Sequence, residues 1–158
     1  MRFYLAGAIE AAPDDGTAWR HDLTEFLGSK LGWTVFDPSL HEEDFLTVSE
    51  KENFRKWKTT DTKRFKSVMK KIIDRDLDHL LNQSDAVICL WDEYATLGAG
   101  THGELTLAYE HDLPVYLVPG MPLEKVSSWI VGCTTEVFSD FKQLEEYLLS
   151  TANNNINE

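Results

Sequence analysis

Apolar residues recur along this chain in two alternating patterns, short continuous runs and longer stretches with helical spacing. A short continuous apolar run is typical of a strand that is buried on both faces of a parallel sheet. The expected strands are Arg2–Ala6, Trp33–Phe36, Ala86–Leu90, Leu113–Val118 and Glu136–Phe138. The expected helices are about Thr17–Leu31, 50–58, Asp61–Leu81, a helix led by Glu104, Leu123–Trp129 and Asp140–Leu149.

Strands that alternate with helices predict an α/β fold with a parallel sheet, helices on both faces and right-handed crossovers. We expect a three-layer, flavodoxin-like or Rossmann-like sheet of five strands in the order 2-1-3-4-5. Ligands bind such sheets at the carboxyl edge, where the strand order reverses between strands 1 and 3. The loop after the first strand, Gly7–Glu10, should therefore face the loop after the third strand, Trp91–Gly103, across one crevice.

The length suits a single domain, which we place at residues 1–150, with a helical insertion at 41–75. The asparagine-rich residues 151–158 are expected to form a disordered tail. His41–Asp44 combines residue types that bind metals, but its spacing matches no ligand pattern, so we expect a solvated loop. The Met and aromatic residues of Asp61–Leu81 recur at helical spacing and are interpreted as core.

Glu104 follows a glycine-rich turn, and two interpretations of its side chain remain open. Thr101 and Glu104 have the spacing of a capping box, in which the glutamate binds its own helix end. A capping box does not require Gly98, Gly100 and Gly103, and glycines at such a turn let a ligand approach the backbone closely. The second interpretation is therefore a carboxylate at a small-molecule site.

The formal net charge of −12 disfavours a general nucleic-acid-binding protein, which needs a basic surface. The basic residues are concentrated, because residues 51–75 hold ten of the fifteen Lys and Arg and only three acidic residues. This segment is either a solvated helix face that lies against an acidic body or subunit, or a rim that attracts anionic substrates.

Further compositional features narrow the class of protein. Cys89 and Cys133 form no CxxC or disulfide pattern, and Cys89 lies in an expected buried strand, where an inert thiol is the default. No apolar run approaches the roughly 20 residues of a membrane span, and the N-terminus is too short for a signal peptide. We expect a cytoplasmic protein that contacts no membrane and requires no metal and no cofactor.

Several short motifs occur in a fixed order along the chain. They are Tyr4–Glu10, Trp19-Arg20, Asp76-Leu77, Ser84–Ile88, Gly100–Leu105 and Pro114-Val115. Over about residues 2–148, their order and spacing resemble the nucleoside 2-deoxyribosyltransferase superfamily. Those enzymes transfer a 2-deoxyribosyl group between nucleobases, and the related deoxynucleotide N-hydrolases cleave the same N-glycosidic bond with water.

The resemblance implies roles for individual residues. Glu104 would be the nucleophile that forms a covalent glycosyl-enzyme intermediate, Tyr4 would orient it, and Asp76 would lie near the substrate. From the residues alone, Tyr4 could instead be an inward-facing strand residue and Asp76 a solvent-facing helix residue. The candidate substrate-binding residues are Gly7, Ala8, Ile9, Trp19, Asp92, Gly98, Gly100 and Thr101.

The sequence also departs from the family pattern. Gly98 stands where the transferases have an aspartate, so Asp92 or Glu93 would have to recognise the base. Lys125–Trp129 resembles a segment through which a neighbouring subunit completes the site, although its first residue is asparagine in the transferases. The loop after the first strand helps to hold phosphate in the hydrolases but is acidic here, so Arg20 or the basic segment would have to compensate.

We therefore expect an enzyme, a nucleoside deoxyribosyltransferase or N-glycosidase, that acts on 2′-deoxynucleosides or related nucleotides. Asp76 or Asp92 would protonate the departing base, and Trp91 or Tyr94 could stack on it. Transfer and hydrolysis both remain open, as do a deoxynucleoside monophosphate N-glycosidase and a non-catalytic nucleotide-binding module. The expected partners are a small-molecule nucleoside or nucleotide and further copies of the chain in a homo-oligomer.

Overall fold

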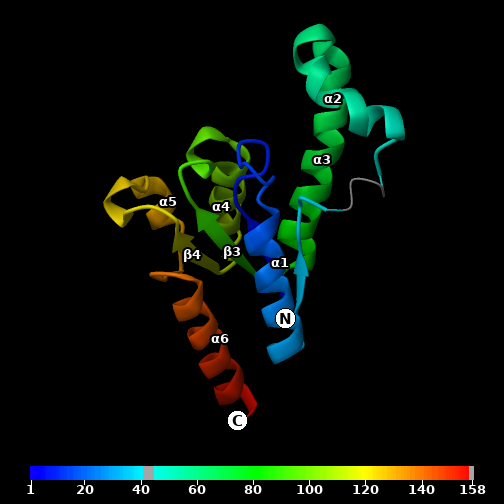
Figure 1. Cartoon of the computed structure of the whole chain (residues 1–158). Helices are drawn as coiled ribbons and strands as arrows, with labels where there is room; N and C mark the ends of the chain where they lie inside the picture. Colours follow the sequence, from blue (N-terminus) through cyan, green and yellow to red (C-terminus); the bar gives the residue numbers. More distant parts are fainter. Residues whose placement is uncertain (41–44, 157–158) are drawn as a thin grey trace.

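Five parallel strands form the centre of the computed structural model, which describes residues 1–40 and 45–156 (Figure 1). The strands are β1 (Arg2–Ala6), β2 (Thr34–Phe36), β3 (Ala86–Trp91), β4 (Val115–Pro119) and β5 (Glu136–Val137). Their order, β2-β1-β3-β4-β5, and their parallel pairing confirm the fold class expected from the sequence. β1 and β3 lie side by side, with Phe3 opposite Ala86.

Successive side chains of each strand point to opposite faces of the sheet, and helices cover both faces. The helices are α1 (Thr17–Phe26), α2 (Val48–Thr60), α3 (Thr62–Gln83), α4 (Gly100–Glu110), α5 (Ser128–Gly132) and α6 (Phe141–Ile156). Tyr4 and Ala6 of β1 pack with residues of α3, α4 and α5. Phe3 and Leu5 of the same strand pack with residues of α1 and α6 on the other face.

The last two expected helices differ in the structure. The helix expected at Leu123–Trp129 is replaced by a short 3-10 turn, Leu123–Lys125, followed by α5. α6 continues to Ile156, so residues 151–156 are helical and not the disordered tail expected, while 157–158 lie outside the described residues. Asparagine lowers helix propensity only modestly, so a helix whose earlier turns are packed in the core can continue through it.

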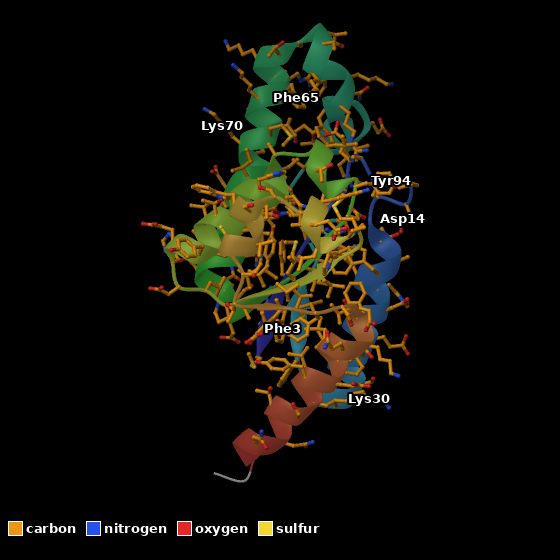
Figure 2. The ribbon with its side chains drawn as sticks, turned by 90° about the vertical axis from the view of Figure 1, so that its left-hand side faces the viewer. Phe3, Asp14, Lys30, Phe65, Lys70 and Tyr94 are labelled. Carbon is orange, nitrogen blue, oxygen red and sulfur yellow. The ribbon has the colours of Figure 1, made fainter. Side chains whose placement is uncertain are left out.

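The insertion forms a helical hairpin that extends beyond the carboxyl edge of the sheet (Figure 1). α2 and the first half of α3 enclose a small apolar cluster built on Leu46, Phe54 and Val68. Figure 2 shows Phe65 and Lys70 on this hairpin, above the loop that carries Tyr94. The expected solvated loop at 41–44 lies outside the described residues. Within 1–40 and 45–156, no helix has the length and apolar character to cross a membrane.

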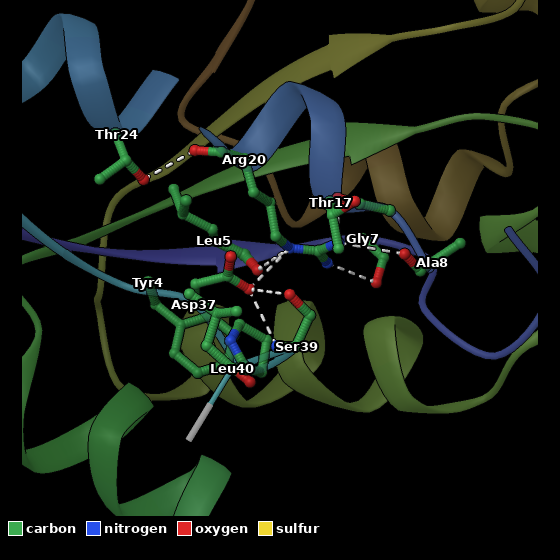
Figure 3. A network of polar contacts seen from close by, with 12 residues as sticks. Tyr4, Leu5, Gly7, Ala8, Thr17, Arg20, Thr24, Asp37, Ser39 and Leu40 are labelled. Carbon is green, nitrogen blue, oxygen red and sulfur yellow. Dashed lines mark hydrogen bonds and ion pairs between the residues drawn. The ribbon is translucent and has the colours of Figure 1, made fainter. Parts of the chain in front are cut away.

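A buried arginine fixes the loop that follows β1 (Figure 3). Arg20 of α1 has no solvent exposure, and its guanidinium donates to the carbonyl oxygens of Gly16 (2.8 Å), Gly7 (3.0 Å) and Ala8 (3.2 Å). Its Nε lies 3.4 Å from Oδ1 of Asp37, directly after β2. One side chain therefore ties together the ends of β1 and β2 and the start of α1.

We predict that Arg20→Met destabilises the fold by roughly 3–5 kcal/mol, because it leaves a buried carboxylate and several carbonyl oxygens without their cation. Chemical denaturation measures the loss of unfolding free energy. Lys30→Met provides the matched control, since Lys30 is an exposed cation beyond α1 and its replacement should change stability by less than about 0.5 kcal/mol. Equal effects of the two substitutions would contradict the structural role of Arg20.

Candidate active site

A cavity of about 550 Å³ opens at the carboxyl edge of the sheet. Its walls are the loop after β1, the α2–α3 hairpin, the loop after β3 and the start of α4. It is lined by Gly7, Ala8, Ile9, Glu10, Ala11, Pro38, Phe54, Arg55, Lys58, Met69, Ile72, Arg75, Asp76, Tyr94, Ala95, Leu97, Gly98, Ala99, Gly100, Thr101 and Glu104. The loops after β1 and β3 therefore face each other across one crevice, as the strand order predicted.

Glu104 of α4 lines this cavity, and Tyr4 of β1 contacts its carboxylate. The Tyr4 hydroxyl donates a hydrogen bond of 2.6 Å to Oε1 of Glu104. Tyr4 itself is completely buried, and its ring packs against Phe36 at a centroid distance of 5.5 Å. A rigid strand residue thus holds the carboxylate at the cavity wall.

The capping interpretation of Glu104 is wrong. α4 begins at Gly100, with Ala99 as its N-cap, so Thr101 and Glu104 both lie inside the helix. No side chain caps this helix end. The earlier start places Glu104 beyond the position from which a side chain can bind the N-cap amide, and its carboxylate binds Tyr4 instead.

The surroundings of Glu104 raise the pKa of its carboxyl group. Burial, reinforced by the negative charge of Asp76, raises the pKa of Glu104 to about 7, while the hydrogen bond from Tyr4 and the charge of Arg20 act in the opposite direction. Burial and the nearby Glu104 carboxylate raise the pKa of Tyr4 well above its usual value. Tyr4 therefore stays protonated and donates its hydrogen bond, while Glu104 titrates near neutral pH.

This raised pKa predicts a pH-dependent difference in stability between the wild type and Glu104→Gln. The pKa of Glu104 is about 7 when folded against 4.5 for an ordinary glutamate, so its stabilising contribution is complete below pH 4.5 and is lost as the pH rises through 7. Glutamine does not titrate. Denaturation at pH 5 and pH 8 should show Glu104→Gln gaining roughly 2–3 kcal/mol relative to the wild type at the higher pH, whereas a constant difference would contradict the burial of this carboxylate.

Asp76 lines the cavity from α3 and is held there by its neighbour. Nε of Arg75 donates to Asp76 Oδ1 at 2.8 Å, and a terminal guanidinium nitrogen lies 2.6 Å from the same oxygen. Arg75 is itself fixed by bonds to the carbonyl oxygens of Pro38 (2.9 Å) and Leu40 (3.1 Å). The structure thus brings Tyr4, Asp76 and Glu104 close together, as the family resemblance implied.

The glycine-rich turn leaves space in front of the backbone. Gly98 and Gly100 line the cavity beside Thr101, whereas Gly103 does not. A Cβ atom added at Gly98, Gly100 or Gly103 would have no atom from another part of the protein within 4 Å, so packing of the protein does not explain these glycines. Together with the cavity, this open space favours the approach of a ligand.

Two candidate substrate-binding residues do not line the cavity. Trp19 stacks on Phe141 of α6 at 5.6 Å, on the other face of the sheet. The Trp19 ring packs closely against the loop after β1, because a Cβ atom added at Gly7 would lie only 3.1 Å from it. Asp92 turns away to accept a 2.8 Å hydrogen bond from the amide of Ala95, so its carboxylate caps the turn that follows β3. The side-chain directions of these two residues are set by tertiary packing.

The aromatic side chains that could stack on a base lie in different places. Tyr94 lines the cavity, whereas Trp91 is buried beneath α4 with its ring edge-on to His102. Arg20, a candidate phosphate ligand, is engaged beneath the β1 loop and does not line the cavity. It therefore does not compensate for the acidic residues of that loop.

The hairpin contributes cavity residues that the sequence interpretation missed. Met69 and Ile72 pack against the apolar cluster of the hairpin, as expected for core residues, and they also line the cavity. Arg75 was noted only as one of the basic residues of the segment 51–75.

The concentration of basic residues in 51–75 was the sequence feature that could have indicated these cavity residues. Arg55, Lys58 and Arg75 all belong to this segment, and all three line the cavity. These three residues lie beside the crevice, and Arg55 and Lys58 also lie near the carboxylates of Asp15 and Glu10, so each interpretation describes part of this arrangement.

The fold resembles that of the solved structure of the Clostridium botulinum CMP N-glycosidase BcmB, with a TM-score of 0.50 and 16% sequence identity. The match covers 94% of this chain and 97% of that chain. It agrees with the fold that the sequence resemblance implied. No family model and no curated protein matches the sequence.

Proposed function

We propose that this protein is an enzyme that cleaves or transfers the N-glycosidic bond of 2′-deoxynucleosides or related nucleotides, with Glu104 as the nucleophile. The observation that carries this proposal is the 2.6 Å bond from the buried Tyr4 hydroxyl to Glu104 at the wall of the cavity. A carboxylate that only stabilised its own helix would need neither this partner nor the open space beside it. A fold shared with a CMP N-glycosidase supports the same class of reaction.

In this mechanism the ionised Glu104 attacks C1′ of the sugar from the side opposite the base. The C1′–O bond to Glu104 forms as the C1′–N bond breaks, the bonding electrons leave with the base, and the base takes up a proton from water. The transition state has oxocarbenium character, which a fixed negative carboxylate stabilises. The resulting ester is then cleaved by water in hydrolysis or by a second base in transfer.

The remaining cavity residues would bind and orient the substrate. Asp76, held by the Arg75 guanidinium, would accept a hydrogen bond from the sugar or contact the departing base. Tyr94 offers a ring on which a base could stack. The backbone around Gly7 and Gly98 forms opposite walls against which the nucleoside would lie.

We also propose that the protein forms a homo-oligomer through Lys125–Trp129. Trp129 is 67% exposed on α5, with its indole N–H bonded to Thr106 at 3.0 Å. A large exposed ring is suited to contact with a second copy of the chain.

A panel of nucleosides and nucleoside monophosphates, separated by chromatography after incubation with the protein, tests the proposed function. Release of free base indicates hydrolysis, and formation of a new nucleoside in the presence of a second base indicates transfer. A non-catalytic module would show ligand-dependent thermal stabilisation with no products. Binding of panel compounds without any product would therefore contradict the proposed enzymatic function and indicate a non-catalytic nucleotide-binding module.

A further inference from the structure

Two cations of the inserted hairpin lie over the candidate active site. Arg55 and Lys58 are three residues apart on α2, a spacing that places both side chains on one face of the helix. Both line the cavity that contains Glu104. α2 therefore presents a pair of positive charges to the ligand space, in a chain whose net charge is −12.

The present partners of these cations hold them weakly. Lys58 Nζ lies 3.9 Å from Oε1 of Glu10, and a terminal nitrogen of Arg55 lies 3.9 Å from Oδ1 of Asp15. These distances are too long for hydrogen bonds, and the cationic side chains of Arg55 and Lys58 are 51% and 60% exposed. Exposed ion pairs of this kind contribute little, so a doubly charged ligand group can displace the two carboxylates.

The other charges of the cavity restrict where an anionic group can lie. Asp76 and Glu104 repel an anion from their side of the cavity, and the guanidinium of Arg75 is engaged by Asp76 and two carbonyl oxygens. Arg55 and Lys58 are the lining cations whose ion pairs are loose. A substrate would therefore place its anionic group beneath α2 and its uncharged glycosidic bond toward Glu104.

We infer that Arg55 and Lys58 form a subsite for a phosphate group carried on the sugar, so the substrate is a nucleoside monophosphate in preference to a nucleoside. This inference rests on the proposed function for the identity of the ligand. It assigns phosphate recognition to the inserted helix, because the loop after β1 carries Glu10 and Asp15. Guanidinium and ammonium groups are the side chains that bind phosphate most strongly.

The test measures binding separately from turnover. Calorimetric titrations of Glu104→Gln with nucleoside 5′-monophosphates and the matched nucleosides give the phosphate preference without cleavage. We expect a preference of at least ten-fold, which Arg55→Gln with Lys58→Gln reduces to near unity. The control pair Lys56→Gln with Lys66→Gln removes the same charge from exposed residues of the hairpin that do not line the cavity, and it should retain most of the preference.

The same variants with Glu104 intact give the ratio of kcat/KM for monophosphate to that for nucleoside. Equal binding of monophosphate and nucleoside, absence of binding, or a preference that survives Arg55→Gln with Lys58→Gln would overturn the phosphate subsite. A preference that depends on Arg55 and Lys58, in a wild type that releases no base, would support the subsite and refute the proposed function. If the double variant fails to fold, the single variants Arg55→Gln and Lys58→Gln, checked by circular dichroism, measure the contribution of each cation to the phosphate preference.

Discussion

Replacing Glu104 by glutamine should lower kcat for N-glycosidic cleavage by about a thousand-fold or more. Glutamine preserves the size of the side chain and can still contact the Tyr4 hydroxyl, but its amide cannot form the glycosyl ester. The loss should therefore occur in kcat, while substrate binding changes much less. Rates of base release under saturating and limiting substrate separate these two effects.

Glu110→Gln is the matched control, because Glu110 lies at the exposed end of the same helix and away from the cavity. It should retain wild-type kcat. Circular dichroism and thermal unfolding should show that Glu104→Gln remains folded. If folded Glu104→Gln retained most of the wild-type kcat, Glu104 would not be the nucleophile.

Replacing Tyr4 by phenylalanine should lower kcat by roughly ten- to hundred-fold, the effect of losing one hydrogen bond to a charged group. It should also move the pH profile. Because Glu104 must be ionised to attack, kcat/KM of the wild type should rise with pH through about 7. The Tyr4 hydrogen bond lowers the pKa of Glu104, so its removal should move this rise to a higher pH.

Tyr116→Phe serves as the control for Tyr4→Phe. Tyr116 lies in the neighbouring part of the sheet but packs against Phe3 and Phe138 on the opposite face. Its loss should leave both kcat and the pH profile unchanged. A lower kcat in Tyr4→Phe with no change in the pH profile would indicate that Tyr4 supports packing only and does not act through Glu104.

The topology follows from features that a sequence carries directly, whereas the pairing of Tyr4 with Glu104 was implied by the family resemblance. Continuous apolar runs such as Ala86–Leu90 predict strands covered on both faces, and alternation with helices then restricts the sheet to few orders. The order 2-1-3-4-5 places the end of β1 beside the end of β3. Tyr4 and Glu104, one hundred residues apart in sequence, therefore become neighbours at one sheet edge.

The errors arise where tertiary contacts decide between local conformations. Thr101 and Glu104 match a capping box, yet α4 starts at Gly100 and the carboxylate binds a residue of another strand. Trp19 and Asp92 lie near the expected crevice in sequence, but their side chains pack against Phe141 and cap the next turn. Local spacing does not determine such side-chain directions.

The position of the insertion relative to the sheet also could not be predicted from the sequence. Its helices were predictable from their apolar spacing, and α2 and α3 occur close to the expected residues. Where the hairpin lies relative to the sheet depends on how its apolar face packs, which periodicity does not specify. The structure places this hairpin beside the crevice, where Arg55, Lys58 and Arg75 become cavity residues.

The covalent intermediate tests the central claim most directly. Protein quenched in acid during turnover of an active substrate from the panel would be digested with protease and analysed by mass spectrometry. The mechanism predicts the mass of one sugar, or of one sugar phosphate, attached to the peptide that contains Glu104, and no such mass in Glu104→Gln. Turnover that leaves Glu104 unmodified while another residue carries the sugar would contradict it.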